Sequence, residues 1–562
     1  MAARKKAAAK RKPSAAKKKK PASAHKRSAV RKTAPPSPKK KVAHSRRTAE
    51  EMAAAQREIS VSEFFTKNRH LLGFDNPRKA LLTAVREGVD NALDACEEAG
   101  ILPEVRVAIA QLENEEDRYR VTIEDNGPGI LPAQVPSIFA RLLYGSKFHR
   151  LKMSRGQQGI GISAAGMYGQ LTTGKPTRIL SRTSSRKPAY ACGLQIDTQT
   201  NTPRLLHEHE EDWDRPHGTR VVIELEGRYQ RGRQSVEEYL HQVSIANPHA
   251  SIVFEAPGAL PLALKRAAET LPPEPKEIKP HPCGIEIGML IRMLHSTRAR
   301  TLAAFLHNDF CRVSSRVAKD ICDRAKLYVN ARPTRIAKSE ADNLFKALRE
   351  TKLMKPPTDC IVPIGEELLL KGLRRGVEAD FYHAVTRPPA VYRGNPFQVE
   401  VGLAYGGQLR GDDTCVVMRF ANRVPLLYQH GACAVTKAVS GIAWKGYGLQ
   451  QSGRQLPVGP LALAVHIASV WVPFTSESKE AIAHYPEIVK EIRLALQECG
   501  RHLGRYVKRR RKAADAERKR QYIEKYIPHI GIALREILDL TERQEKLVVN
   551  RLETMLEKSR KM

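Results

Sequence analysis

The stretch NPRKALLTAVREGVDNALDACEEAG, residues 76–100, constrains the fold more than any other part of the sequence. Its apolar residues recur at the spacing of one helix face and Gly100 follows as a stop signal, so the pattern predicts an amphipathic helix. Glu87 and Asn91 are four positions apart and project from the same helix face. A carboxylate there can accept a proton from water, and an amide oxygen can ligate a hard cation. Because this spacing is also common on solvated helices, it needs support from other motifs.

The segments after this helix alternate between strand and helix patterns. VRVAIAQL and YRVTIED have the alternation of half-buried strands, as do TRILSRTS, AYACGLQID and GTRVVIELEG. Among them, SRGQQGIGISAAGMYGQLTTG changes from a glycine-rich loop into a helix of small residues. Strands at hairpin spacing mixed with helices predict an α+β sandwich with helices on one sheet face.

Two glycine-rich motifs are candidates for binding a nucleotide. The sequence DNGPG, residues 125–129, follows a predicted strand. An Asp in this place, next to glycines that let a flat ring approach the backbone, suits hydrogen bonding to an exocyclic amine such as that of adenine. GQQGIG, residues 156–161, enters a predicted helix, whose free N–H groups and dipole favour phosphate. Either motif alone is typical of an ordinary turn or of helix packing, so their order and spacing carry the signal.

Taken together, the E-x-x-x-N helix, the D-x-G-x-G turn and the glycine-rich lid resemble the ATPase group of gyrase, heat-shock chaperones, sensor histidine kinases and MutL proteins (the GHKL group, with its Bergerat fold). His217-Gly218-Thr219 is similar to the fourth motif of that group, a Gly-Thr strand start near the adenine. The segments LLGFDNPRKALLTAVREGVDNALDA, LLYGSKFHRLKMSRGQQGIGIS and QLTTGKP further resemble the B subunit of DNA topoisomerase VI. This resemblance extends from about residue 60 to residue 535.

The resemblance implies a role for each motif residue. Glu87 would activate the water that attacks the γ-phosphate, Asn91 would hold Mg²⁺, and Asp125 would bind adenine. The loop from Arg155 to Ile162 would close over the phosphates. The residues expected to bind ATP are Asn91, Asp125, Gly127, Gly129, Ser146, Lys147, Arg155, Gly156, Gln157, Gln158, Gly159, Ile160, Gly161, Ile162, Thr219 and Lys479.

Lys479 is the expected catalytic residue that lies farthest along the chain from Glu87. The segment WVPFTSESKE resembles the transducer segment of the family, where one lysine reaches back to the γ-phosphate. A fixed cation there would offset charge that develops in a reaction governed by positioning and electrostatics. The alternative is a surface lysine paired with Glu477 or Glu480, which composition alone favours.

The charge of the chain indicates a polyanionic partner. The 562 residues carry a formal net charge of +35, and 19 Lys or Arg against one acid lie in the first fifty. We expect residues 1–55 to be a disordered basic tail that contacts phosphates nonspecifically, although a solubilising or targeting extension fits its composition nearly as well. Double-stranded DNA is the expected partner rather than a membrane.

The resemblance also implies how the rest of the chain divides into domains. We expect an ATPase domain at 56–277, a helix-two-turns-helix domain at 278–355 after a proline-rich linker, an α/β transducer domain at 356–519 and a C-terminal helical segment at 520–562. Basic residues of the helical domain, and the run VKRRRK at 507–512, could touch DNA or simply face water. The arginines in question are Arg292, Arg298, Arg300 and Arg312.

These expectations define a function and exclude others. The sequence has no long apolar run and no secretory signal, and its nine scattered cysteines suit a reducing compartment, so we expect an intracellular protein. The resemblance implies the ATP-driven clamp subunit of a type IIB topoisomerase that dimerises through its N-terminal domains when ATP binds. Because no E-G-D-S cluster is seen, strand cleavage would belong to a separate A subunit in an A2B2 assembly. The alternatives are another ATPase of the same group and an architectural DNA-binding protein with a vestigial site.

Overall fold

The chain divides into two compact units, Met1–Glu58 and Ile59–Met562. The first contains helix α1 (Ala49–Ala54); the rest of the expected basic tail lies outside the described residues. All other elements belong to the second unit. The computed structural model describes residues 48–54, 60–113, 115–145, 150–156, 159–476 and 478–558.

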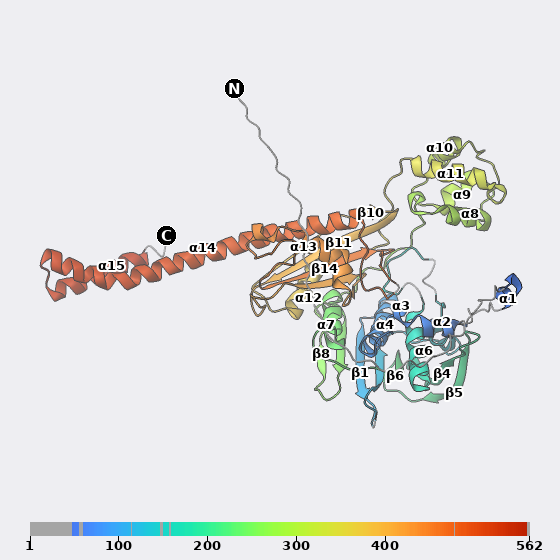
Figure 1. Cartoon of the computed structure of the whole chain (residues 1–562), viewed down its shortest axis with the longest axis horizontal. Helices are drawn as coiled ribbons and strands as arrows, with labels where there is room; N and C mark the ends of the chain where they lie inside the picture. The colour runs from blue at the N-terminus through green and yellow to red at the C-terminus, as the bar shows by residue number, and fades with distance from the viewer. Residues whose placement is uncertain are drawn as a thin grey trace, which may run out of the picture. The chain divides into compact units, whose positions relative to one another are not determined.

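An eight-stranded sheet forms the N-terminal part of the second unit (Figure 1). The strand order is β5-β4-β3-β6-β2-β1-β7-β8. Neighbours are antiparallel except β1 and β7, which are parallel. The register places Asp125, the last residue of β2, opposite Thr219 at the start of β6. The strands are β1 (Glu104–Gln111), β2 (Arg118–Asp125), β3 (Thr177–Arg182), β4 (Ala189–Ile196), β5 (Pro203–Glu211), β6 (Gly218–Glu226), β7 (Ser251–Glu255) and β8 (Leu262–Leu264).

Helices α4 (Pro77–Glu98), α6 (Gly161–Thr173) and α7 (Val236–Ala246) pack on this sheet and enclose one apolar core. The Asn76 side chain caps α4 by accepting the N–H of Arg78 at 2.9 Å. Gly88 brings α4 against the sheet, since a Cβ there would lie 2.3 Å from Ile123 Cδ1. Leu81 and Leu93 are buried in this core, and truncating either to Ala would cost about 2–5 kcal/mol. Shorter helices flank these: α2 (Val61–Lys67), α3 (Arg69–Leu72) and α5 (Val135–Phe139).

A helical insert with its own core follows β8. Thr301 and Ser314 cap two of its helices through their hydroxyl oxygens. Phe305 and Phe310 meet edge to face inside the core, with ring centroids 5.5 Å apart. The insert consists of α8 (Ile287–Ser296), α9 (Leu302–Asp309), α10 (Ser315–Ala325) and α11 (Lys338–Glu350), with 3₁₀ turns at Pro282–Gly284 and Pro333–Arg335.

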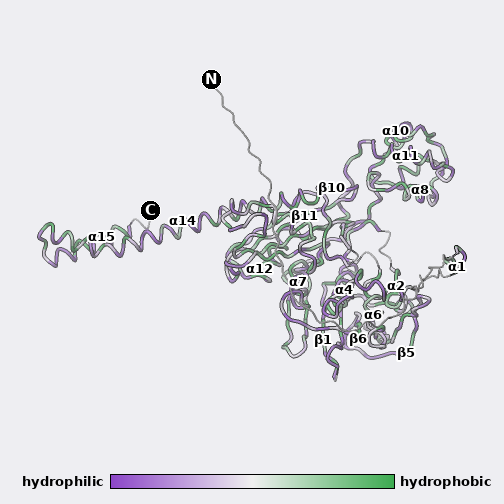
Figure 2. The backbone as a smooth tube through the Cα atoms, viewed as in Figure 1, coloured by the Kyte–Doolittle hydropathy of each residue, from purple (hydrophilic) through white to green (hydrophobic). Residues whose placement is uncertain are grey.

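A second, six-stranded sheet follows the insert, with β11 and β14 paired at its centre. Every residue of β14 is buried, and β11 is hydrophobic over much of its length (Figure 2). Glu400, fully buried on β11, accepts the main-chain N–H groups of Ile364 and Gly365 at 2.7 Å and so fixes the start of α12. The strands are β9 (Phe381–Thr386), β10 (Ala390–Tyr392), β11 (Asn395–Tyr405), β12 (Val416–Ala421), β13 (Val424–Pro425) and β14 (Leu461–Ser469). The helices are α12 (Glu366–Gly376) and α13 (Ala434–Ser440), with 3₁₀ turns at His430–Ala432 and Trp444–Tyr447.

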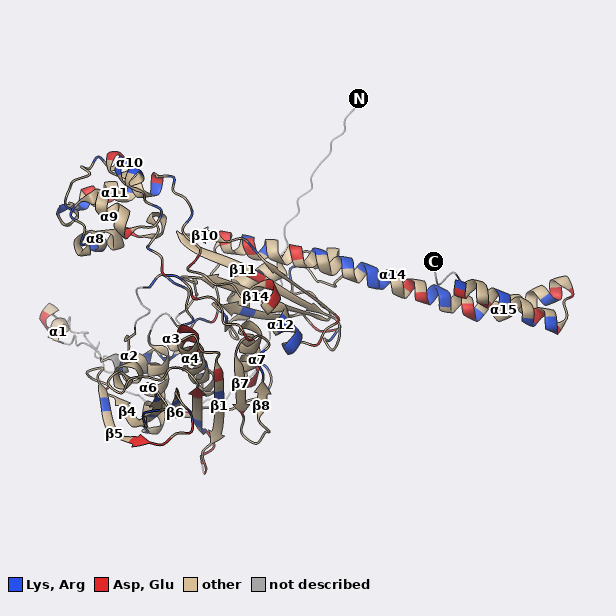
Figure 3. Cartoon of the chain, turned by 180° about the vertical axis from the view of Figure 1, so that it is seen from behind, with Lys and Arg blue, Asp and Glu red and all other residues tan. Residues whose placement is uncertain are grey.

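The long helix α14 (Pro486–Leu538) packs its first turns on the second sheet and then continues with Lys and Arg along its length (Figure 3). Ile488, Ile492 and Leu496 supply the buried contacts. Helix α15 (Glu542–Lys558) packs back against α14. Of the described helices, none is both long enough and apolar enough to cross a membrane.

The predicted elements agree with this architecture except at a few places. The α+β class, the helix that stops before Gly100, the quoted strands and the helical stretch after residue 283 are confirmed. The expected α/β transducer domain contains helices α12 and α13 beside its strands. Strand β8 lies within the proline-rich stretch at residues 258–282, which the sequence predicts to be a linker. Helix α14 passes through residue 519, where we expect the transducer domain to end.

Candidate active site

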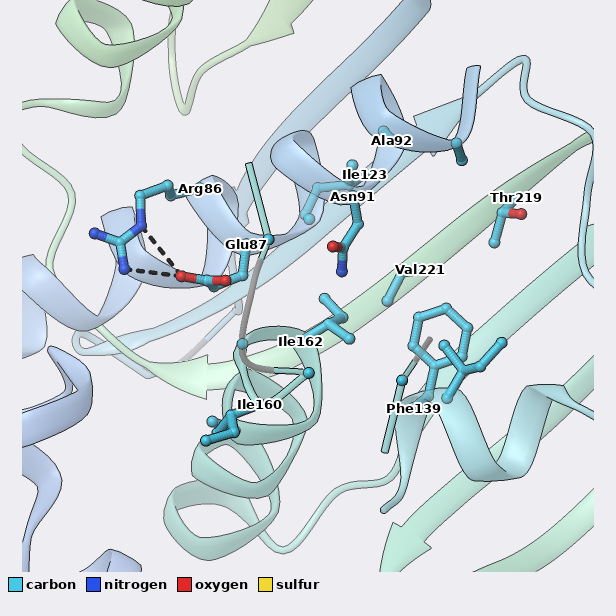
Figure 4. A pocket seen from close by; sticks show the side chains of 18 of the residues that line it. Arg86, Glu87, Asn91, Ala92, Ile123, Phe139, Ile160, Ile162, Thr219 and Val221 are labelled. Atoms are coloured by element: carbon cyan, nitrogen blue, oxygen red, sulfur yellow. Dashed lines mark hydrogen bonds and ion pairs between the residues drawn. The ribbon is translucent and has the colours of Figure 1, made fainter. Parts of the chain in front are cut away.

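A cavity of about 570 Å³ lies between α4, the ends of β2 and β6, the glycine-rich lid before α6, and a loop that follows the second sheet (Figure 4). The helix spacing places Glu87 and Asn91 on the cavity face of α4, as predicted. Lys479 enters the same cavity from the loop. The predicted residues that line it are Glu87, Asn91, Asp125, Gly129, Gly156, Gly159, Ile160, Gly161, Ile162, Thr219 and Lys479.

Glu87 is held by its neighbour in sequence. Arg86 donates from Nη2 and Nε to Glu87 Oε1 at 2.8 and 3.2 Å, as the dashed lines in Figure 4 show. Although burial raises the pKa of Glu87, the positive charges of Arg86 and Lys479 outweigh it and hold that pKa below its usual value. The carboxylate is therefore ionised at neutral pH and available to accept a proton.

The lid helix begins directly against this carboxylate. A Cβ built on Gly161 would lie 1.8 Å from Glu87 Oε2, so only glycine allows the first turn of α6 to come this close. At Gly156 a Cβ would be 3.7 Å from Asn91 Oδ1, which leaves that amide oxygen in the open cavity. The Asn91 side chain makes no hydrogen bond to another described residue. Gly161 therefore sets how closely α6 approaches Glu87, and Gly156 places no side chain beside the Asn91 amide.

The turn after β2 is built around one carboxylate oxygen. Asp125 Oδ1 accepts the N–H of Gly127 at 2.8 Å and that of Thr219 at 3.2 Å. Burial nevertheless raises the pKa of Asp125 to about 6, because those two bonds only partly offset the loss of solvent. His217 Nδ1 lies 2.8 Å from the carbonyl oxygen of Gly127 and braces the turn. Gly129 has a φ of +71°, a left-handed conformation that favours glycine.

The loop that carries Lys479 is fastened to α4 on both sides of the lysine. Arg86 Nη1 donates to the carbonyl oxygen of Ser478 at 3.1 Å, and Lys79 pairs with Glu480 at 2.5 Å. Lys479 Nζ lies 3.4 Å from the carbonyl oxygen of Arg155. Glu480 is thus engaged by Lys79, and Glu477, the other partner considered for Lys479, lies outside the described residues.

The side chain of Arg155 lies elsewhere. It is 4% exposed and binds Asp94 at 2.7 Å, Glu97 at 2.6 Å and the Asn247 side chain at 2.6 Å, inside the protein. The resemblance implied that Arg155 closes over the phosphates with the rest of the loop. In the structure its guanidinium faces away from the cavity, because the two buried carboxylates of α4 attract it, and only its main chain lies beside the lid.

Several predicted residues lie outside the described part of the chain, and others were missed. Ser146, Lys147, Gln157 and Gln158 are among the residues that the structure does not describe, as is Glu477. Arg86 was not predicted, since an arginine next to a glutamate has no distinctive sequence pattern. The apolar walls were also missed, although their alternation on strands was a usable signal. They include Ile123, Phe139 and Val221, whereas Ile162 was among the predicted residues.

The described residues contain no cluster of three or more His, Cys, Asp or Glu side chains suited to hold a metal. Mg²⁺ that is bound together with phosphate oxygens usually takes only one or two protein ligands. Asn91 is the side chain placed to contribute one oxygen ligand.

Comparison with known proteins places this site in a class. Residues 76–228 match the family "Histidine kinase-, DNA gyrase B-, and HSP90-like ATPase", and residues 356–519 match "Topoisomerase VI B subunit, transducer". The fold and the cavity are therefore those of a GHKL-type ATPase joined to a transducer domain. The chain is 50% identical over 492 residues to the B subunit of type 2 DNA topoisomerase 6 from Methanosarcina barkeri, an alignment that spans 87% of this chain and 79% of that protein. It is 47% identical over 502 residues to the protein of the same name from Archaeoglobus fulgidus, spanning 89% of this chain and 82% of that one.

The chain belongs to the family of type 2 DNA topoisomerase 6 B subunits. It is an ATP-binding, ATPase subunit of a type IIB DNA topoisomerase, as the motifs implied.

Proposed function

We propose that the cavity binds ATP with Mg²⁺ and that the chain uses each turnover to close and reopen a protein clamp around duplex DNA. The observation that carries the proposal is the convergence of Glu87, Asn91, Asp125 and Lys479 on one cavity from three separate segments of the chain. In a vestigial site, no constraint would keep all four side chains directed into the same cavity.

The residues that border the cavity fit a magnesium nucleotide. Within the described residues no hydrogen bond engages the Asn91 amide oxygen, Gly156 places no side chain beside it, and Gly161 lets α6 begin directly against Glu87. Mg²⁺ would neutralise charge on the phosphates when bound. Asn91 would be its protein ligand.

Each side chain then has one task. Glu87 would orient the attacking water and take its proton, since its lowered pKa keeps it ionised. Asp125 would accept the amine of adenine on the oxygen that the Gly127 and Thr219 N–H groups leave free. The main chain of the lid would bind phosphate at the N-terminus of α6. Lys479 would contact the γ-phosphate and stabilise the charge that develops there.

The partners follow from the same proposal. Double-stranded DNA is the substrate, the topoisomerase VI A subunit performs strand cleavage in an A2B2 assembly, and ATP brings two copies of the N-terminal domain together. The net charge of +35 supports a polyanionic partner.

The direct test is strand passage. The chain should hydrolyse ATP faster with DNA than without it, and should relax supercoiled plasmid only when ATP and the cognate A subunit are both present. ATP-independent binding to DNA with no turnover would favour the architectural alternative, and cleavage by this chain alone would favour a gyrase-like enzyme.

A second test concerns the tail, which lies outside the described residues. Deleting residues 1–50 removes 18 net positive charges and should flatten the slope of log affinity against log salt, because fewer counterions are released from DNA. Basal ATPase should persist. An unchanged slope would show that the tail does not engage DNA.

A further inference from the structure

The loop between β5 and β6, residues 212–217, leads directly into the candidate adenine site, and we call it the β5–β6 loop. At its end, His217 Nδ1 lies 2.8 Å from the carbonyl oxygen of Gly127. Two residues later the N–H of Thr219, which lines the cavity (Figure 4), donates to Asp125 Oδ1 at 3.2 Å. The path of this loop therefore sets contacts of the turn that carries the carboxylate expected to bind adenine.

A buried carboxylate on the far face of the sheet holds this loop. Side chains alternate along β2, so Glu124 points away from the face on which Ile123 packs against Gly88 of α4. We call the face that carries Glu124 the outer face. The Glu124 carboxylate pairs with two guanidinium groups: Arg220 Nε donates to Oε2 at 2.7 Å, and Arg215 Nε lies 2.5 Å from Oε1. Because one arginine belongs to β6 and the other to the β5–β6 loop, Glu124 joins the loop to the two strands that end at the cavity.

A third arginine, Arg182 at the end of β3, binds the main chain of the same loop. Its Nη1 donates to the carbonyl oxygens of Trp213 and Arg215, the latter at 3.1 Å. Trp213 is 5% exposed, and Arg220 Cζ lies 5.2 Å from the centroid of its ring. The β5–β6 loop is therefore fixed to β3 through its main chain and to β2 through the Arg215 side chain.

The charges of this pair also act on the adenine carboxylate, in opposite directions. Burial raises the pKa of Asp125 to about 6; the positive charge of Arg215 lowers that pKa, and the negative charge of Glu124 raises it. The titratable groups that face the same turn from other elements are the Cys96 thiol on α4 and the His217 imidazole in the loop. Arg215 thus holds the loop and at the same time favours the ionised carboxylate.

We infer that Arg215 is a positioning residue: its pair with Glu124 holds the β5–β6 loop in the place that lets Asp125 bind adenine. The inference rests on the proposed function and adds to it two residues that do not line the cavity. The net contribution of one such hydrogen bond corresponds to about a 2- to 13-fold change in an equilibrium constant, so adenosine affinity should weaken by that factor without Arg215.

The test uses the full chain, with adenosine as the probe because it carries no titrating phosphate. Equilibrium binding is measured from about pH 5 to about pH 8, on both sides of the Asp125 titration. In Arg215→Met, affinity at pH 8 should fall by about 2- to 13-fold, and the midpoint of the loss in acid should move to higher pH, because a charge that lowers the Asp125 pKa is gone. Glu124→Gln should weaken binding by a similar factor but move the midpoint to lower pH, since it removes a charge that raises that pKa. A loss of packing alone would not move the midpoint in opposite directions.

A conservative variant and the ATPase reaction sharpen the result. Arg215→Lys keeps the positive charge and should keep the midpoint near that of the parent, while a compact ammonium only partly replaces the planar fork and restores part of the affinity. In steady-state ATPase, Arg215→Met should raise KM and leave kcat within about twofold, since the adenine contact is equally strong in the ground state and the transition state.

Glu224 on β6 provides the matched control. The register of β2 and β6 places it on the outer face as well, opposite Arg120. Its carboxylate also pairs with two arginines, Arg120 of β2 and Arg178 of β3, each at 2.9 Å. Glu224→Gln should therefore remove comparable ion pairs from the same sheet face while adenosine affinity and the midpoint stay as in the parent.

An Arg215→Met variant that binds adenosine like the parent would overturn the inference, as would midpoints that move in the same direction in Arg215→Met and Glu124→Gln. Equal losses of affinity in Glu224→Gln would overturn it too, because the effect would then not be specific to the β5–β6 loop. These outcomes leave the proposed function intact. If Asp125→Asn binds adenosine as tightly as the parent at every pH, the proposed adenine contact itself is wrong, and the inference falls with it.

Discussion

The two sides of the nucleotide cavity are assembled in different ways. On one side, Arg86, Glu87 and Asn91 lie within six residues of a single helix, and their directions follow from its 3.6-residue turn. On the other side, Lys479 arrives from a loop joined to that helix by the Arg86 bond to Ser478, which spans 392 residues of sequence. A rigid helix can hold a base and a cation ligand at all times, whereas a docked loop can leave.

This difference separates the residues that carry out hydrolysis from the residue that responds to the bound nucleotide. The α4 side can hold the reacting groups in every state of the enzyme. The transducer side offers a charge that the triphosphate engages and the diphosphate does not, which is the differential interaction that any ligand-driven switch requires. Mutations on the two sides should therefore produce different kinds of defect.

The largest effect should come from Glu87→Gln. The amide keeps the size of the side chain but cannot take a proton, so turnover should fall by roughly 10²- to 10⁴-fold while ATP still binds. The analogue-driven movement of the transducer should remain, because the α4 side does not sense the nucleotide. Steady-state ATPase and equilibrium binding measure this, with Glu116→Gln on the exposed β1–β2 turn as the matched control. Turnover near the parent rate would refute the assignment of Glu87 as the base.

Lys479→Ala should also lose hydrolysis, but unlike Glu87→Gln it should lose the nucleotide-dependent movement of the transducer as well. Hydrolysis should fall roughly 10²-fold, as for other lost transition-state donors, with ADP affinity nearly intact. The distance between ATPase and transducer domains should no longer differ between ADP and a nonhydrolysable ATP analogue. Lys479→Arg should rescue only in part, because a planar fork replaces a compact ammonium. The exposed Lys437 on α13 provides a control substitution.

If Lys479→Ala keeps the parent's nucleotide-dependent distance change, the lysine is no sensor and the switch lies elsewhere.

A smaller effect should appear in the pH dependence of adenine binding. Burial raises the pKa of Asp125 to about 6, and the adenine amine favours the ionised carboxylate. Affinity should therefore be constant above pH 7 and weaken as pH falls through 6, by about tenfold at pH 5. Adenosine is the suitable probe, since it has no titrating phosphate. Asp125→Asn should bind more weakly but without this slope, and a flat profile in the parent would contradict the assignment.

The smallest effect should follow Arg86→Met, which removes the hydrogen bond from Arg86 to the carbonyl oxygen of Ser478. Removing the guanidinium removes a charge that lowers the pKa of Glu87, so that pKa should rise and the acid limb of kcat should move to higher pH. Turnover at pH 8 should fall only a few-fold, because Glu87 remains ionised there. The exposed Arg78→Met on the same helix should leave the profile unchanged. An acid limb that does not move would show that Arg86 does not set the state of the base.

Much of the catalytic side could be predicted before the structure. The spacing of Glu87 and Asn91, the position of Asp125 at the end of a strand, and the glycines of the lid all depend on local backbone geometry, which sequence periodicity reports directly. The predicted helix and the helix α4 stop within two residues of each other for the same reason. The resemblance to known ATPases rests on these same local patterns.

The arrangement of Arg155, Asn422 and the Lys479 loop could not be predicted in this way. Arg155 lies in a loop expected to bind phosphate, yet the buried carboxylates of Asp94 and Glu97 hold its side chain inside the protein. Asn422 meets Ser154 across 268 residues of sequence. Neither contact has a period or a motif, since the Arg155 pairs join a loop to α4 and the Asn422 bond joins that loop to the part of the chain with the second sheet.

The sequence by itself determined which groups this protein can use for chemistry: a base and an amide on one helix face, a carboxylate at a strand end, and glycines where phosphate must approach. Only the tertiary structure decided how those groups are coupled to the rest of the chain. The physical reason is the separation along the sequence over which each kind of interaction acts. Helix and strand periodicity relates residues a few positions apart, whereas the bonds from Arg86 to Ser478 and from Asn422 to Ser154 depend on how two sheets pack, which no local pattern encodes.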